Sequence, residues 1–258
     1  MSAVVSVPVQ APYPWLSILA YLSPRSTPGV ETISADRYVR KMPSGIVAVE
    51  YDSSAPALRC SITDAPDALP RIQRLFDTLH DPHPVTRALQ NCPVLGPRVE
   101  RLPGLRVPGC WEPFELCLRV ILGQQVSVKA AHTLMGRLVA RCPGLDPGQL
   151  VETDLGTLGL PSARLQTLRA FAERVAGRAI RLDAPWDQTA SRLAEVPGIG
   201  PWTLQYLAIR LGRDPDAFPE TDLGLLRGAQ AQSPRCLRAL AETWRPYRAY
   251  AAMYLWAG

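Results

Sequence analysis

The residues best suited to chemistry are one acidic and two aromatic side chains between residues 193 and 222. Asp222 follows a Pro-bearing loop at a helix N-cap position, where a carboxylate either caps the helix or stabilises a positive charge developing in a bound substrate. Trp202 and Tyr206 lie one helical turn apart, opposite an aliphatic stripe with i, i+3, i+4, i+7 spacing. Aromatic side chains that face away from the core need a second surface, which is either a neighbouring domain or a cleft.

A tight turn precedes the aromatic helix. Proline fixes φ and glycine permits the positive φ that other residues avoid, so residues 197–200 are predicted to form a turn. Pro201 suits the first position of the next helix, because its missing N–H costs nothing there. The N–H groups and partial positive charge at such a helix start can bind a phosphate without a cationic side chain. The predicted phosphate-binding hairpin comprises Pro197, Gly198, Ile199, Gly200 and Thr203.

The order of Gly-rich hairpin, aromatic helix, Pro-bearing loop and Asp222 resembles the helix-hairpin-helix/Gly-Pro-Asp signature of the DNA glycosylase superfamily. Within that superfamily the chain most resembles the bacterial 3-methyladenine DNA glycosylase II family. The resemblance covers nearly the whole chain, since residues 13–21, 107–127, 158–161 and 244–256 also match the family's segments. The hairpin alone occurs in non-catalytic DNA-binding proteins as well, so the combination with Asp222 and the C-terminal helix makes the match specific.

The resemblance implies a pocket for a damaged base. It places Trp202, Tyr206, Trp256 and Tyr21 in that pocket, where aromatic faces would stack on a cationic purine. Asp222 would stabilise the positive charge that forms on the sugar as the N-glycosidic bond breaks. An N3- or N7-alkylated purine leaves readily without a general acid, so a site with one Asp suits 3-methyladenine and 7-methylguanine.

Two further positions complete the predicted site: a second carboxylate in the loop and a residue that would fill the gap left by a flipped base. Glu220 is a second carboxylate in the Asp222 loop, but loop carboxylates are mostly solvated, so no catalytic role is predicted for it. The family places the side chain that fills the gap left by a flipped base in the turn at residues 124–126. This chain carries Gln125 where some relatives have a bulky aliphatic residue; an amide is a weaker wedge but can hydrogen-bond an orphaned base.

Two absences define the expected type of enzyme. Bifunctional relatives place a Schiff-base lysine directly after the hairpin, whereas this chain has Trp202 there. The C-terminal four-cysteine run that binds an iron–sulfur cluster in endonuclease III-type relatives does not occur. The resemblance therefore implies a monofunctional glycosylase without lyase activity or cofactor. It also implies a monovalent cation at the hairpin carbonyls, with no metal held by side chains.

Composition agrees with a nucleic-acid partner. The formal net charge of +5 and pI of about 9.0 favour an anionic partner, which we predict to be double-stranded DNA containing damaged bases. The six Cys include no CxxC and the three His are not grouped with them, so metal-ligand spacing is absent. Without a signal peptide or membrane-spanning run, the expected state is a cytoplasmic monomer that associates with the nucleoid when acting on DNA.

The apolar spacing predicts a mainly α protein with a small N-terminal α+β domain, in a helix-hairpin-helix DNA glycosylase fold. The predicted domains are residues 1–85 and residues 86–258, with the hairpin at about 189–211 and Thr189 capping its first helix. Strands are predicted at 38–42, 45–52 and 58–63. Helices are predicted at 15–22, 69–79, 111–122, 128–140, 163–175, 189–196, 202–211, 222–230, 235–242 and 247–256.

Two other functions remain open from the sequence alone. One is a glycosylase for deaminated or oxidised bases, against which the aromatic pair Trp202 and Tyr206 argues moderately. The other is a non-catalytic helix-hairpin-helix DNA-binding protein, against which the presence of Asp222 argues.

Overall fold

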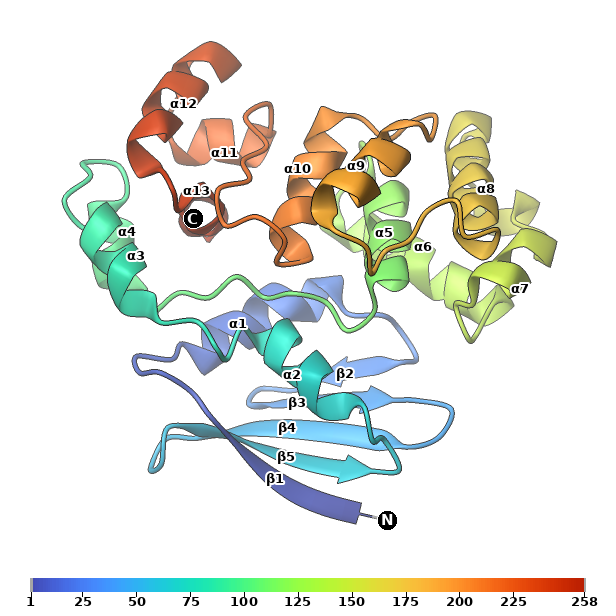
Figure 1. Ribbon diagram of the computed structural model, residues 1–258, viewed down its shortest axis with the longest axis horizontal. Coiled ribbons are helices and arrows are strands. Elements are labelled where there is room, and N and C mark those ends of the chain that lie inside the picture. The colour runs from blue at the N-terminus through green and yellow to red at the C-terminus, as the bar shows by residue number, and fades with distance from the viewer. Residues whose placement is uncertain (1, 258) are drawn as a thin grey trace.

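The N-terminal part of the chain is an antiparallel five-stranded sheet with two helices on one face (Figure 1). The computed structural model describes residues 2–257. The strand order is β1-β5-β4-β3-β2, so the first strand pairs with the last. The strands are β1 (Ser2–Pro8), β2 (Glu31–Ile33), β3 (Arg37–Lys41), β4 (Ile46–Asp52) and β5 (Ala57–Thr63).

One hydrophobic cluster holds this sheet to its helices. Helix α1 (Trp15–Leu22) and helix α2 (Ala68–Phe76) bury apolar side chains such as Ile18 and Ile72 against Val47, Val49 and Leu58 of the sheet. Burial of such side chains is worth about 1.5–3 kcal/mol each. Tyr21, in the last turn of α1, packs against this cluster and also against a cluster of the helical part of the molecule.

The rest of the chain is helical, so the predicted fold class is confirmed. The α-helices are α3 (Pro82–Leu89), α4 (Gly96–Arg101), α5 (Pro113–Gly123), α6 (Val128–Arg141), α7 (Pro147–Glu152), α8 (Ser162–Ala176), α9 (Trp186–Ala194), α10 (Pro201–Arg210), α11 (Leu223–Gly228), α12 (Pro234–Ala241) and α13 (Arg248–Trp256). The 3₁₀ turns are η1 (Ser23–Arg25), η2 (Gly156–Leu158) and η3 (Glu242–Trp244). Among residues 2–257 no helix is long and apolar enough to cross a bilayer.

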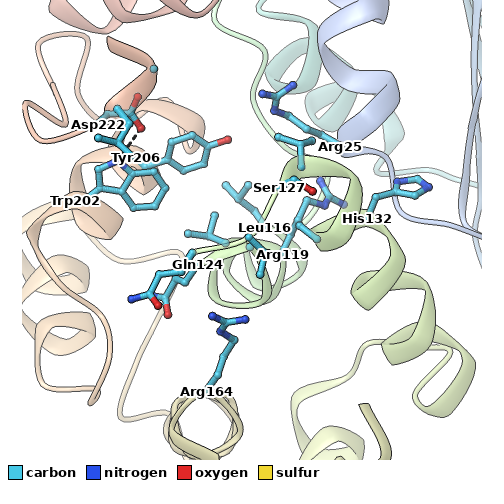
Figure 2. Close-up of a pocket in the computed structure, with 18 of the residues that line it drawn as sticks. Arg25, Leu116, Arg119, Gln124, Ser127, His132, Arg164, Trp202, Tyr206 and Asp222 are labelled. Atoms are coloured by element: carbon cyan, nitrogen blue, oxygen red, sulfur yellow. Dashed lines mark hydrogen bonds between the residues drawn. The ribbon is translucent and has the colours of Figure 1, made fainter. Parts of the chain in front are cut away.

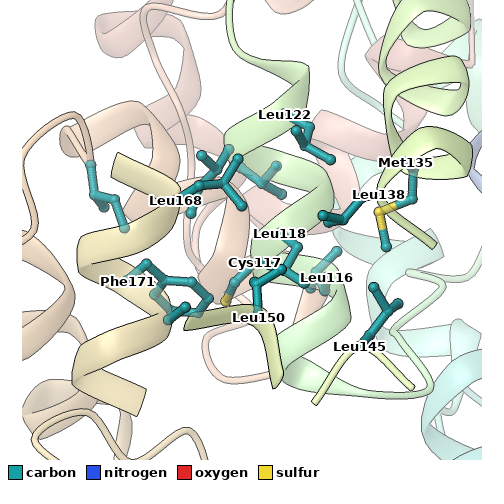
Figure 3. Packing of buried hydrophobic residues seen from close by; sticks show 14 of the residues in the cluster. Leu116, Cys117, Leu118, Leu122, Met135, Leu138, Leu145, Leu150, Leu168 and Phe171 are labelled. Atoms are coloured by element: carbon teal, nitrogen blue, oxygen red, sulfur yellow. The ribbon is translucent and has the colours of Figure 1, made fainter. Parts of the chain in front are cut away.

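Two further clusters divide the helices, and α10 belongs to both. Its Leu207 packs with the buried residues of α5, α6 and α8, some of which are drawn in Figure 3. Its Ala208 and Ile209 pack with α3, α4 and the helices from α11 to α13. Helix α10 therefore lies between the two halves of the helical part, each built around one of these clusters. Its aromatic face lies where the two halves meet.

Secondary structure differs from the sequence prediction at particular helix starts and strands. The three predicted strands are confirmed to within one residue, but β1 and β2 were missed, since β1 is a largely exposed edge strand and β2 has only three residues. Thr189 does not cap α9, which begins at Trp186. Thr189 is buried within the helix and its hydroxyl donates to the carbonyls of Arg181 (3.0 Å) and Ala184 (3.2 Å).

The predicted domain boundary at residue 85 falls inside α3 and stays a prediction. Val85 and Leu89 of α3 pack with the C-terminal helices, whereas Phe76 of α2 packs against the sheet.

A buried ionic network joins the sheet to α5. Glu115 on α5 accepts from Arg40 of β3 at 2.6 Å and from Arg119 at 2.9 Å, and from the Thr27 hydroxyl. Arg40 also pairs with Glu31 of β2 at 3.2 Å. Burial alone would raise the pKa of the Glu115 carboxyl, but the two guanidinium groups outweigh it and hold that pKa below its usual value. The network fixes the helix whose C-terminal end carries the turn at residues 123–127.

Candidate active site and nucleic-acid interface

A cleft of about 1010 Å³ lies between the two halves of the helical part (Figure 2). Parts of α1, α5, α6, α8, α10, α11 and α13 border it. It brings together seven of the sequence-predicted site residues, which are Tyr21, Gln125, Gly198, Trp202, Tyr206, Asp222 and Trp256. The other hairpin residues Pro197, Ile199, Gly200 and Thr203 do not line it.

Asp222 is held by three donors that converge on its two oxygens. Trp202 Nε1 donates to Oδ2 at 2.8 Å, as the dashed line in Figure 2 marks. Trp256 Nε1 and the backbone N–H of Leu225 both donate to Oδ1 at 2.9 Å. An ionised carboxylate is purely an acceptor, so it matches three donors better than a neutral carboxyl or an amide would. The predicted N-cap of α11 is thus confirmed, and the same carboxylate lines the cleft.

The aromatic side chains form a wall of the cleft beside this carboxylate. The rings of Trp202 and Tyr206 are stacked, with centroids 5.3 Å apart and an interplanar angle of 12°. Trp256 is tilted by 59° against Tyr206 at 5.7 Å. All three are half-buried, so each keeps part of its surface open to the cleft. The wall can stack a flat ring next to Asp222.

Arg210 is a site residue that sequence reasoning missed. It is 1% exposed, and its Nη1 donates to the hydroxyls of Tyr21 and Tyr206, both at 3.1 Å. Its Nε and Nη2 donate to the carbonyls of Pro108 (2.6 Å) and Gly109 (2.8 Å). The signal was present in the sequence, because Trp202, Tyr206 and Arg210 follow one another at i, i+4 and i+8 on one helix face.

The buried guanidinium changes the acidity of a tyrosine in the cleft. Burial favours the neutral phenol, but the charges of Arg210 and Arg25 outweigh it and lower the pKa of Tyr206 to about 8. Arg25 also lies over the Tyr21 ring, with its Cζ 4.1 Å from the centroid. Two cations therefore stand at the Tyr206 end of the wall and one carboxylate at the Trp202 end.

The turn after α5 places Gln125 at the rim of the cleft. Gln125 is exposed, has a φ of +57° and lines the cleft. Its neighbour Gln124 donates through Nε2 to the Gly198 carbonyl at 2.8 Å and to the Thr203 hydroxyl at 3.4 Å. These hydrogen bonds link the turn at residues 124–126 to the predicted phosphate-binding hairpin.

Only one of the two hairpin glycines needs a left-handed backbone. Gly198 has a φ of +90°, and a Cβ there would lie 2.3 Å from the Thr167 hydroxyl oxygen. That hydroxyl donates to the Pro197 carbonyl at 2.8 Å, so α8 supports the turn. Gly200 has a φ of −100°, so the prediction that it uses positive φ is wrong, and open space surrounds its Cβ position.

Neither a second carboxylate nor a clustered metal site joins the cleft. Glu220 forms an ion pair with Arg238 of α12 and does not line the cleft. Within residues 2–257 no group of three or more His, Cys, Asp or Glu is placed to hold a metal ion. The hairpin carbonyls of Pro197 and Gly198 each accept one hydrogen bond and keep a second lone pair, so the monovalent cation stays a prediction.

The two glycines provide a matched pair of variants for the hairpin. Gly198→Ala is expected to weaken binding to damaged and undamaged DNA alike by roughly 5–30-fold, because a left-handed non-Gly residue costs about 1–2 kcal/mol. Gly200→Ala should fold normally, since its backbone is extended and its surroundings are open. Fluorescence anisotropy with both duplexes measures the effect. Selective loss of affinity for damaged DNA in Gly198→Ala would contradict a backbone-binding role.

The Trp202 side chain should matter for the reaction more than for folding. Trp202→Ala removes a stacking face worth about 1–3 kcal/mol and the donor to Asp222, so base release is expected to fall by roughly 5–100-fold or more. Trp244→Ala is the matched control: Trp244 is 1% exposed, so its loss should cost about 3–5 kcal/mol of folding free energy. Melting temperature and single-turnover release, measured on both variants, separate the roles. A larger melting-temperature drop in Trp202→Ala than in Trp244→Ala would make Trp202 a core residue.

This arrangement defines a class of protein: the hairpin, the cleft and the carboxylate at the start of α11 form the fold of helix-hairpin-helix DNA glycosylases. Residues 4–112 match the AlkA N-terminal domain family. A crystal structure of a DNA-3-methyladenine glycosidase from Bacillus halodurans superposes with a TM-score of 0.56 and 26% identity, covering 67% of this chain and 88% of that one.

The sequence relatives identify the family. DNA-3-methyladenine glycosylase 2 of Escherichia coli K12 is 32% identical, over 96% of this chain and 94% of its own length. A Mycobacterium tuberculosis protein named as a probable bifunctional transcriptional activator/DNA repair enzyme AlkA is 34% identical over 97% of this chain. The chain spans 56% of the length of that mycobacterial relative. The chain belongs to the DNA-3-methyladenine glycosylase 2 (AlkA) family.

Proposed function

We propose that this protein is a monofunctional DNA glycosylase that flips out and excises alkylated, cationic purines, such as 3-methyladenine and 7-methylguanine, and leaves an abasic site for base excision repair. The observation that carries the proposal is the Asp222 carboxylate held by the two indole donors of Trp202 and Trp256 at the end of an aromatic wall. The family relationship supports it, because relatives over nearly the whole chain are named 3-methyladenine glycosylases.

The geometry suits bond cleavage at a sugar carbon. As the C1′–N bond of an alkylated purine breaks, its electron pair neutralises the purine and positive charge develops on the sugar. A fixed carboxylate beside that carbon stabilises the charge and can orient a water for attack. The hydrogen bonds from Trp202, Trp256 and the Leu225 amide hold both Asp222 oxygens in place before the reaction.

The proposed partner is double-stranded DNA that contains damaged bases. The backbone N–H groups at the start of α10 would hold a phosphate, since a helix N-terminus favours an anion. Gln125 would enter the stack at the flipped base, because it is exposed and lines the same cleft. The proposal includes a monomer that needs no iron–sulfur cluster or other cofactor, acting in the cytoplasm on the nucleoid.

Base release from a panel of substrates tests the specificity. Purified protein is incubated with DNA treated with a methylating agent and with duplexes that contain uracil, and the released bases are quantified. Release of 3-methyladenine and 7-methylguanine without uracil is expected. Release of uracil in preference to methylated purines would favour a glycosylase for deaminated bases, and binding without release would favour a non-catalytic protein.

The reaction product should be an intact abasic strand. Trp202 stands directly after the hairpin, where bifunctional relatives carry the Schiff-base lysine, so no covalent imine with the sugar is expected. The product strand should break only after hot alkali or a separate lyase. Borohydride should trap no enzyme–DNA adduct in denaturing electrophoresis, and a trapped adduct would contradict the monofunctional assignment.

A further inference from the structure

Exposed apolar side chains gather along the cleft. Among residues 2–257 the large apolar side chains that stay exposed are Val4, Leu16, Ile46, Leu79, Val126, Val128 and Leu223. The last three line the cleft, and the other four do not. Single exposed apolar residues are ordinary on a protein surface, but a group of them marks a place where another molecule binds. A part of the ligand without hydrogen-bonding groups is therefore expected to contact this surface.

Leu223 is the most exposed of these three side chains, at 66%. It is the first residue of α11 and directly follows Asp222. Leu225 of the same helix is fully buried, so α11 is held to the core without Leu223. The position between them, Gly224, faces inward, because a Cβ there would lie 3.0 Å from Asp222 Oδ1 and 3.1 Å from Trp256 Cδ1. Leu223 is thus available to a ligand.

Arg227 lies on the same face of α11 as Leu223. The two residues are four positions apart, which makes their side chains neighbours on the helix surface. Arg227 is exposed and lines the cleft, and within residues 2–257 its guanidinium group has no hydrogen-bond or ion-pair partner. An apolar side chain beside an unpaired cation matches a DNA backbone, in which each deoxyribose has an apolar C2′ methylene and is joined to anionic phosphates.

The proposed role of Asp222 indicates which sugar this is. Asp222 stands beside C1′ of the flipped nucleotide, and the Cα atoms of consecutive residues are about 3.8 Å apart. Leu223 is therefore within side-chain reach of the same deoxyribose. Arg227 lies about one helical turn of 5.4 Å further along α11, within reach of a phosphate next to that sugar.

The turn that carries Gln125 approaches the DNA from another side. Val126 and Val128 belong to this part of the chain, and Figure 2 shows Ser127 between them across the pocket from Asp222. The gap in the base stack and the flipped sugar are therefore contacted by different elements, which are the turn after α5 and the start of α11.

We propose that Leu223 and Arg227 clamp the damaged strand: Leu223 packs against the C2′ edge of the flipped deoxyribose, and Arg227 binds a backbone phosphate next to that sugar. The clamp holds C1′ against the Asp222 carboxylate while the base lies on the aromatic wall. The inference rests on the proposed glycosylase function and assigns two substrate-positioning residues to the same site.

Leu223→Ala tests the apolar contact. Saturated single-turnover release of 7-methylguanine from a duplex should fall by about 10-fold, because most of the buried apolar surface of the side chain is lost. The dissociation constant for an undamaged duplex should change by less than about 2-fold, because the contact forms only with a flipped sugar. Leu223→Met keeps an apolar chain of similar size and should restore release to within about 2-fold of wild type. The matched control is Leu79→Ala, since Leu79 is 79% exposed and does not line the cleft.

A mismatched duplex distinguishes the clamp from a residue that fills the base stack. Flipping is easier when 7-methylguanine lies opposite adenine than when it lies opposite cytosine. Gln125→Ala should therefore lose more activity on the paired lesion than on the mismatched one. Leu223→Ala should lose the same factor on both, because its contact forms after flipping. A loss confined to the paired lesion would make Leu223 a stack-filling residue and overturn the proposal.

Arg227→Gln tests the phosphate contact. The DNA is a duplex with a tetrahydrofuran abasic analogue, which provides the sugar without a base to release. The slope of log K against log salt concentration should become shallower by about 0.9, the value for one lost phosphate contact. The matched control is Arg59→Gln, because Arg59 is an exposed residue of β5 that pairs with Glu50, and its slope should equal that of wild type.

Two further results would overturn the inference. One is an unchanged salt slope in Arg227→Gln, and the other is equal release of 7-methylguanine by Leu223→Ala and Leu79→Ala. Failure of the wild-type protein to release 7-methylguanine would instead contradict the proposed function.

Discussion

Asp222→Asn is expected to slow release of methylated purines by on the order of 10²–10³-fold, the effect of removing one preorganised electrostatic stabiliser. The change removes the charge that would face the sugar cation. It also places an amide N–H₂ group among three donors, namely Trp202 Nε1, Trp256 Nε1 and the Leu225 amide, so one of these loses its acceptor. DNA affinity should stay the same or rise slightly because one negative charge is lost. Single-turnover release and equilibrium binding on the same duplex measure both effects.

The loop itself offers the control for this experiment. Glu220 precedes Asp222 by two residues but pairs with Arg238 and does not line the cleft. Glu220→Gln should therefore leave base release within about 2-fold, as exposed ion pairs contribute little. Near-normal release by Asp222→Asn, or an equal loss in both variants, would remove Asp222 from its proposed role and make it a helix cap only.

The central site residues could be predicted because their roles depend on local sequence. Trp202 and Tyr206 share a helix face through their spacing alone, and Asp222 stands at an N-cap that the Pro-bearing loop makes recognisable. The structure shows in addition that the indole of Trp202 donates to Asp222. That contact joins residues 20 positions apart on different elements, and no local pattern specifies it.

Residues whose role depends on long-range contacts could not be predicted in this way. Arg210 holds Tyr21, which is 189 positions earlier in the chain, and Glu115 holds Arg40 across 75 positions. Each is a charged residue buried only because the fold supplies partners. Within a short stretch of sequence, such a residue looks the same as a charged residue that is exposed to solvent.

Three helices, α3, α4 and α7, were not predicted, and two of them, α3 and α7, share a local cause. Helix α3 begins with Asp81 and Pro82, and α7 begins with Asp146 and Pro147; in both the Asp side chain accepts from a first-turn backbone N–H. The same helix-start rule predicts the start of α10 at Pro201. The helices that position the site, α5, α10 and α13, were nevertheless predicted to within about two residues at each end.

Glu115→Gln is expected to lower the free energy of unfolding by about 3–5 kcal/mol at neutral pH. Glu115 is 5% exposed and is the acceptor shared by Arg40, Arg119 and Thr27, so its loss leaves two buried guanidinium groups with too few anions. The matched control is Glu50→Gln: Glu50 pairs with Arg37 and Arg59 on the exposed side of the sheet, where such pairs are worth about 0–1 kcal/mol. Urea unfolding followed by circular dichroism measures both variants.

Acidification should abolish the difference between wild type and Glu115→Gln. The pKa of Glu115 is lower in the folded protein than in the unfolded chain, where it is about 4.3. Its ionisation therefore stabilises the fold above that pH, and the contribution is lost as the pH falls through the folded-state pKa. The urea midpoints of the two proteins should be well separated at neutral pH and converge as the pH falls through the folded-state pKa of Glu115. A separation that stays constant with pH would mean that Glu115→Gln destabilises the protein by changing packing. The charge of Glu115 would then not be what holds the sheet to α5.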